Sequence, residues 1–234
     1  MIVSDRQQPR GAEGGGAGAS PGEKSADRGS FLGFVAHEMR NPLSTALWSA
    51  ELLARLAPED RAGPRGEKLS NMCLRALQRL RLLVEDHFLA ERLGVDGIPF
   101  RSDAVPVREM LEQVAGKLGV EAKLAVDETL AVRADRGLLE RVLDALLAVA
   151  SHGKSPVHID AQRSGETVTL TLRGAPPAPG ALEMPHKGTP SDPTGRALAL
   201  HMAVQVAQAL GGTLTAPAEA YLLTLPLAPA PGGP

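Results

Sequence analysis

Apolar residues recur in steps of three and four along two long segments in the first part of the chain, which is the spacing of an amphipathic helix. A stretch rich in proline and glycine separates the two segments at residues 58–66. The predicted inward positions are Leu32, Ala36, Met39, Leu43, Ala46, Ala50, Leu53 and Ala57 in the first segment, and Leu69, Cys73, Ala76, Leu80, Leu83, His87 and Ala90 in the second. Leu77, Val84 and Phe88 widen the second stripe beyond what one partner helix covers. The pattern predicts a helical hairpin that pairs with a second copy as a four-helix bundle.

A different pattern begins near Val105, where short strand-like runs alternate with helical ones. Helices are expected from Val105 onward, over 138–151 after Asp135, and over 195–210, with Gly211 and Gly212 ending the last. Strands are expected over 120–126, 130–134, 157–160, 167–172, 213–215 and 221–225. This order predicts an α/β sandwich with helices on one face of a mixed sheet. The expected fold class is therefore α+β: an N-terminal helical hairpin in a dimeric four-helix bundle, followed by this sandwich.

Composition places the expected boundaries between these parts. Residues 1–28 are rich in glycine, alanine, serine and charge, and cannot bury enough apolar surface to offset the entropy of ordering, so a disordered leader is predicted. The hairpin domain is expected over 29–95 and the sandwich over 104–226. The proline- and glycine-rich residues 227–234 are expected to form a disordered tail.

Composition and charge also exclude several classes of function. The 234 residues are 43% hydrophobic with a net charge of -2, which gives no general reason to expect nucleic-acid binding. A single cysteine, Cys73, excludes an internal disulfide and leaves no cysteine cluster for zinc. No apolar stretch reaches the roughly 18 residues that span a bilayer, and no signal-peptide core is present. A cytoplasmic protein without membrane contact is expected.

The first helical segment contains the run Phe-Leu-Gly-Phe-Val-Ala-His-Glu-Met-Arg-Asn-Pro-Leu, residues 31–43. A neutral imidazole such as that of His37 is a nucleophile near pH 7, because its reference pKa of about 6.5 leaves one ring nitrogen unprotonated. Glu38 is placed to hold the proton on the other nitrogen. Asn41 follows one turn later on the same face and can orient a water molecule. Pro42 lacks an N–H group and is expected to bend the helix just past the reactive residue.

This run resembles the phosphoacceptor box of sensor histidine kinases. The resemblance implies that His37 takes a phosphoryl group and passes it to an aspartate of a response-regulator receiver domain. It also implies that Glu38 assists this transfer and that Asn41 supports dephosphorylation of the regulator. The order of elements after residue 104 is similar to the ATP-binding domain of the same family. His37, Glu38 and Asn41 are the expected catalytic residues.

The second domain departs from the family at the positions that contact nucleotide. Two family asparagines, one of which holds Mg²⁺, correspond to Ala145 and Val149, and a valine cannot bind a cation that requires oxygen ligands. The aspartate that binds adenine corresponds to Gly174, and the next glycine to Pro176. In the last glycine-rich box only Gly195 survives. The methyl groups of Ala197 and Ala199 there would obstruct the approach of a phosphate to the backbone.

Three functions follow from an intact acceptor box beside these losses. The first is a phosphotransferase or phosphatase that uses no cofactor or metal, takes phosphate from a regulator or an upstream histidine kinase, and works as a homodimer. The second is a divergent histidine kinase that autophosphorylates His37 from ATP and Mg²⁺. The third is a non-catalytic dimeric scaffold for a kinase or regulator. Retention of Glu38 and Asn41 weighs against the scaffold, which needs neither.

Two further features of the second helical segment have simpler interpretations. His87 interrupts the apolar seam, but the sequence places no second ligand opposite it, so a packed histidine is favoured over a metal ligand. The segment also carries several arginines, for most of which a solvated helix face is favoured over contact with an acidic regulator surface. They are Arg75, Arg79, Arg81 and Arg92.

Overall fold

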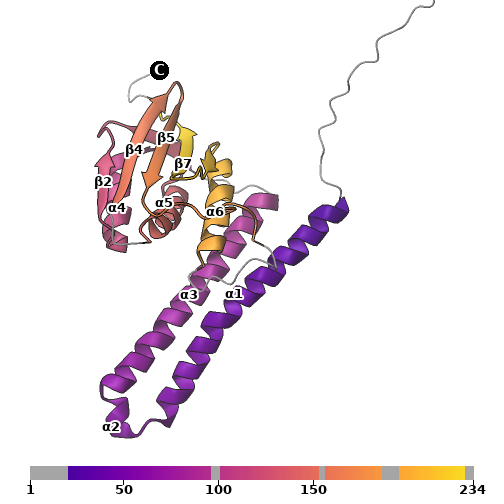
Figure 1. Ribbon diagram of the computed structural model, residues 1–234, viewed down its shortest axis with the longest axis vertical. Coiled ribbons are helices and arrows are strands. Elements are labelled where there is room, and N and C mark those ends of the chain that lie inside the picture. Colours follow the sequence, from indigo (N-terminus) through magenta and orange to yellow (C-terminus); the bar gives the residue numbers. More distant parts are fainter. Residues whose placement is uncertain (1–20, 96–100, 153–155, 186–194, 230–234) are drawn as a thin grey trace, which may run out of the picture.

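The computed structural model describes residues 21–95, 101–152, 156–185 and 195–229. The chain begins with a long hairpin of α1 (Pro21–Arg55) and α3 (Pro64–Val95), joined by the short α2 (Pro58–Arg61). The α/β domain sits at the end of the hairpin opposite α2 (Figure 1). Within the described part of the chain, no helix is both long enough and apolar enough to cross a membrane.

The hairpin corrects one expected boundary. Helix α1 begins at Pro21, inside the range 1–28 that was expected to be disordered, whereas residues 1–20 lie outside the described residues. A proline at the start of a helix has the φ angle that the first turn requires, and the amide hydrogen that it lacks would have no intrahelical partner there. The helix continues through Pro42, whose side chain is buried.

Four positions of the seam predicted for α3 are buried within the single chain, whereas part of the seam predicted for α1 is exposed there. Leu69, Ala76, Leu83 and Ala90 of α3 are all buried. In α1, however, Leu32 and Leu43 are each 45% exposed. Ala46 is buried as predicted, and the other buried residues of α1 lie outside the predicted seam: Phe31, Phe34, Val35, Glu38, Pro42 and Ser49. Helix α1 is apolar on more than one side, so its period alone does not determine which stripe faces α3.

The α/β domain is built on a five-stranded sheet with the strand order β2-β4-β5-β7-β6. Its strands are β2 (Ala122–Ala125), β4 (Val157–Ser164), β5 (Thr167–Arg173), β6 (Thr213–Thr215) and β7 (Tyr221–Pro226). The β2–β4 pair is parallel and the other pairs are antiparallel. A separate antiparallel pair joins β1 (Asp103–Pro106) to β3 (Ala131–Ala134).

Three helices pack on the sheet and enclose the core of this domain: α4 (Val107–Leu118), α5 (Arg136–Ala150) and α6 (Arg196–Ala209). Asp135 caps α5, because its carboxylate accepts hydrogen bonds from the backbone N–H groups of Gly137 and Leu138 at 3.0 and 3.1 Å. The core includes the fully buried Met110, Leu143, Leu146, Leu172 and Leu223. The α+β class, with a helical hairpin followed by an α/β sandwich, is therefore confirmed.

The structure adds two features to the predicted domain. Strand β1 was not expected: a helix was predicted from Val105, but Val105 and Pro106 lie in β1, which pairs with β3, and α4 begins at Val107. The expected tail 227–234 is wrong at its start: Leu227 bridges Val132, and the backbone N–H of Ala228 donates to the carbonyl of Ala131 at 3.0 Å. Residues 230–234 lie outside the described residues.

Candidate functional site

His37 lies on α1 with 54% of its side chain exposed, next to a carboxylate that is almost entirely buried. The Nδ1 atom of His37 is 3.6 Å from the Oε1 atom of Glu38, whose side chain is 1% exposed. This distance is too long for a hydrogen bond and short enough for a charge to act on the ring. The exposed ring can meet a partner, and Nε2 is the ring nitrogen left for that partner.

A small apolar cluster joins the hairpin to the α/β domain near this site. Phe31, Phe34 and Val35 of α1 pack with Leu83 of α3 and Leu198 of α6, and Met39 and Ala197 lie at the edge. Helical spacing puts Glu38 on the same side of α1 as Phe31 and Phe34. Because Glu38 is buried, its carboxylate has little room to move away from the neighbouring ring.

Asn41 lies one helical turn after His37 and is also exposed. The hydroxyl of Thr45 donates to the backbone carbonyl of Asn41 at 3.1 Å. The i, i+4 spacing puts Asn41 and His37 on the same side of α1, as expected. The structure therefore brings the expected catalytic residues together on one accessible surface, with Glu38 beneath it.

The positions that differ from the family pattern are also brought together, on α5 and the start of α6. Ala145 and Val149 of α5 and Ala199 of α6 line a cavity of about 330 Å³, together with the surviving Gly195, which precedes α6. The side chains at the two asparagine positions offer no oxygen to a metal. Two carboxylates also line this cavity, but both are paired with cations: Asp144 with Lys117, and Asp86 with Arg141. The residues present do not fit a magnesium ion bridging phosphates.

Gly174 and Ala197 do not line that cavity. Gly174 lies at the end of β5 against α5, so closely that a Cβ atom there would collide with the carbonyl group of Ala150. The next backbone N–H, that of Ala175, donates to the same carbonyl at 2.7 Å. Ala197 packs against the apolar cluster next to α1. Packing between helix and strand, or between helix and hairpin, accounts for both residues.

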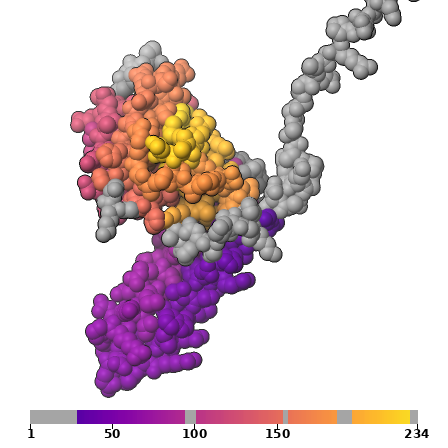
Figure 2. All heavy atoms as spheres, in the orientation of Figure 1, coloured from indigo at the N-terminus to yellow at the C-terminus, as the bar shows by residue number. Residues whose placement is uncertain are grey.

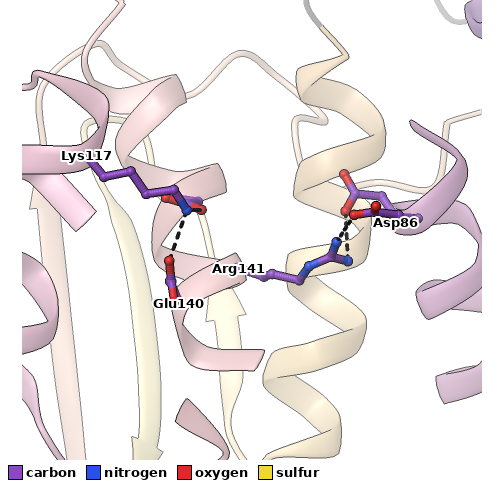
Figure 3. A network of polar contacts seen from close by, with 6 residues as sticks. Asp86, Lys117, Glu140 and Arg141 are labelled. Carbon is purple, nitrogen blue, oxygen red and sulfur yellow. Dashed lines mark hydrogen bonds and ion pairs between the residues drawn. The ribbon is translucent and has the colours of Figure 1, made fainter. Parts of the chain in front are cut away.

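Charged side chains around the cavity form two ion-pair groups that the sequence did not reveal (Figure 3). Lys117 donates to Glu140 at 2.9 Å and to Asp144 at 2.7 Å, and these hydrogen bonds raise the pKa of Lys117. Arg141 of α5 reaches Glu85 at 2.7 Å and Asp86 at 3.4 Å, both on α3. Burial raises the pKa of Asp86 to about 6, against the opposing effect of Arg141.

His87 is packed as expected. Its ring lies 5.8 Å from the ring centroid of Phe31 and 5.8 Å from that of Phe88. The ring of Phe31 also contacts buried His201 of α6 at 5.1 Å, and burial lowers the pKa of His201. In the described part of the chain, no cluster of three or more histidine, cysteine or acidic residues could hold a metal ion.

The chain thus joins a hairpin, with an exposed histidine beside a buried glutamate, to a sheet covered by helices. Residues 27–94 match the His Kinase A (phospho-acceptor) domain, HisKA. The sequence is 28% identical to sensor histidine kinase ZraS of Salmonella typhimurium over 196 residues, covering 76% of this chain and 40% of that protein. It is 28% identical to sensor histidine kinase MtrB of Mycobacterium leprae over 222 residues, covering 84% of this chain and 39% of that protein. These sequence matches are thus to sensor histidine kinases and to their phosphoacceptor domain.

The fold agrees with solved structures of that family. Acinetobacter baumannii histidine kinase AdeS aligns with a TM-score of 0.63 at 18% identity, covering 84% of this chain and 98% of that one. Full-length ShkA in complex with AMPPNP aligns with a TM-score of 0.56 at 21% identity, covering 91% of this chain and 47% of that one. At this identity the likeness concerns the fold alone. The chain spans about 40% of the length of the curated relatives it matches.

Proposed function

We propose that this chain transfers phosphoryl groups in two-component signalling without productive use of ATP. His37 accepts a phosphoryl group from a phosphorylated receiver domain or an upstream histidine kinase and passes it to the aspartate of a response regulator. The observation that carries the proposal is the contrast between two surfaces. His37 is exposed above buried Glu38, whereas the face formed by α5 and α6 presents alanine and valine where nucleotide ligands are needed.

The chemistry needs only the residues around His37 and a phosphorylated partner. The Nε2 lone pair attacks phosphorus in the partner's acyl phosphate, the N–P bond forms, and the bond from phosphorus to the aspartate oxygen breaks, which frees the carboxylate. The proton on Nδ1 stays in place, and the charge of Glu38 stabilises the cationic ring. In the reverse direction, a receiver carboxylate attacks phosphorus and the N–P bond breaks. Asn41 is placed to orient a water molecule for hydrolysis of the regulator's acyl phosphate.

The proposal includes a homodimer formed by the hairpin. Large apolar side chains remain exposed along α1 and α3: Leu32, Leu43, Leu47, Trp48, Leu74, Leu77, Leu82 and Phe88 are 45–62% exposed. The α2 end of the hairpin projects away from the α/β domain (Figure 2), so that domain does not cover it. Exposed apolar surface of this kind is typical of an association surface. A second hairpin would cover it as a four-helix bundle.

We expect Leu47→Glu combined with Leu74→Glu to convert the dimer to a monomer, because the dimer would bury both charges in an apolar interface. Light scattering at micromolar protein would measure the change. Met184→Glu is the matched control, since Met184 is 47% exposed but lies outside the hairpin. A monomeric parent protein would contradict the dimer, as would a double variant that remains dimeric.

The proposal predicts a labelling pattern that separates it from an active kinase. Radiolabelled Mg-ATP alone should leave the protein unlabelled, because Val149 and Ala145 offer no metal ligand. Label should appear when a regulator phosphorylated by an active histidine kinase is added. Calorimetry should detect no binding of Mg-ATP at millimolar concentration. Label from ATP alone would establish the divergent kinase instead, and no label under either condition would favour the scaffold.

A further inference from the structure

Helix α3 packs along the face of the α/β domain that α5 and the start of α6 form. The cavity of about 330 Å³ between them is lined by all three helices, including Arg79, Leu83 and Asp86 of α3. Figure 1 shows α6 lying against the upper part of α3. The hairpin thus contacts the same face that carries Val149 and Ala199, and three contacts hold it there.

The first contact explains why one glycine of the last box survives. Gly195 precedes α6 with a φ angle of 68°, in the left-handed region that favours glycine. The guanidinium group of Arg79 lies so close that a Cβ atom on Gly195 would collide with its Nη2, Cζ and Nη1 atoms. Arg75, Arg81 and Arg92 are exposed, as predicted for most of these arginines, whereas Arg79 is partly buried and packs between the domains.

The second contact is the ion pair between α5 and α3 (Figure 3). Arg141 reaches the carboxylate of Glu85 at 2.7 Å and that of Asp86 at 3.4 Å. The arginine side chain is 30% exposed and that of Asp86 is 15% exposed, so the pair is partly shielded from solvent. Charge-assisted pairs of this kind fix orientation as well as adding attraction.

The third contact is apolar. Leu83 of α3 and Leu198 of α6 are 2% and 0% exposed in the cluster with Phe31 and Phe34. Ring contacts of Phe31 with His87 and His201 extend it from the hairpin to α6. An apolar contact alone would allow α3 to slide along the α/β domain. The positions of Arg79 next to Gly195 and of Arg141 next to Glu85 and Asp86 fix α3 in one place on that domain.

We propose that the face formed by α5 and the start of α6 is a docking surface for the chain's own α3, with Arg79 seated on Gly195 and Arg141 paired with Glu85 and Asp86. The domain is then held in one position on the phosphoacceptor hairpin by its former nucleotide-facing side. Gly195 persists because it receives an arginine, not a phosphate. This inference rests on the packing and holds whether or not His37 accepts phosphate.

Distances between spin labels in the full chain test the docking. Labels would be placed at Ser70→Cys on α3 and Glu128→Cys in the α/β domain, both exposed, with Cys73→Ser. Labelled chains would be diluted with unlabelled chain, so that only distances within one chain are measured. The parent protein should give one narrow distance distribution.

Gly195→Ala should broaden this peak, because the guanidinium group of Arg79 must move away from the added methyl group while Arg141 and the apolar contact remain. Gly119→Ala is the matched control: its φ angle is 64°, so it carries similar backbone strain, but nothing lies within 4 Å of its Cβ. It should keep the narrow peak. Adding Arg79→Ala to Gly195→Ala should recover the narrow peak in part, because the smaller alanine leaves space for the methyl group. A narrow peak in Gly195→Ala, or equal broadening in Gly119→Ala, would overturn the seating of Arg79.

A charge reversal tests the second contact independently of any strain at Gly195. Arg141→Glu places like charges opposite Glu85 and Asp86 and should broaden the distance distribution. Arg136→Glu is the control, because Arg136 lies on the same helix but pairs within the α/β domain, with Glu109 at 3.0 Å. Adding Glu85→Arg to Arg141→Glu should restore the narrow peak. Equal effects of the reversals at positions 141 and 136 would overturn the role of Arg141.

Discussion

Replacing His37 by alanine is expected to abolish labelling by a phosphorylated regulator. In the proposed transfer the exposed imidazole is the nucleophile, and alanine offers no atom that can bond to phosphorus. Acid-labile radiolabel on the protein would be measured after incubation with the phosphorylated regulator. His158→Ala is the matched control, since His158 is another exposed histidine but lies on β4 of the α/β domain. The control should label like the parent protein.

Glu38→Gln separates the role of the carboxylate from that of the ring. The amide keeps the size of the buried side chain but removes its charge, so labelling should persist at a rate lowered by about 10²-fold, the usual scale for loss of a group that stabilises developing charge. A rate equal to that of the parent would show that the 3.6 Å approach of Glu38 to Nδ1 has no chemical role. Label that survives His37→Ala would refute phosphotransfer through this residue altogether.

Local signals in the sequence were sufficient for most elements of the fold. Asp135 opens α5 through its own carboxylate, and Gly211 and Gly212 follow the end of α6, so these boundaries depend on neighbouring residues only. Strand β1 and the packed start of the expected tail depend on pairing with β3, which is distant in sequence. Part of the seam predicted for α1 is exposed in the single chain for a related reason. A helix that is apolar on several sides takes its inward face from its partners.

In the candidate site, too, the sequence predicts contacts between neighbouring residues but not those between residues far apart in the chain. His37, Glu38 and Asn41 are close in sequence, and helix geometry alone places them together. The contacts of Arg79 with Gly195 and of Arg141 with Glu85 join residues from separate domains, so no spacing rule reveals them. The sequence showed only that Gly195 survives among altered neighbours. The contact of Gly195 with Arg79 of α3 accounts for the glycine at this position.

The buried carboxyl of Asp86 is expected to make the protein less stable as the pH rises from about 4 to about 6. Its pKa is about 6 in the folded protein and has a reference value of 3.8, which we take for the unfolded chain. Between these values the folded state keeps a proton that the unfolded state has released, so the free energy of unfolding falls as pH rises. The full shift corresponds to roughly 2–3 kcal/mol. Burial, together with the charges of Glu85 and Asp144, raises the pKa of Asp86 and outweighs Arg141 and Arg79, which lower it.

Asp86→Asn should remove this pH dependence, because the amide has the same shape and never ionises. At pH 7.5 the variant should be more stable than the parent by up to about 2 kcal/mol, whereas at pH 4 the two should agree, since the parent carboxyl is then largely protonated. Urea unfolding at a fixed protein concentration would measure both values, because dimerisation makes stability depend on concentration. Glu67→Gln, at an exposed position on α3, should leave the profile unchanged. Equal destabilisation of Asp86→Asn at both pH values would mean that its contact with Arg141 outweighs the cost of burying the charge.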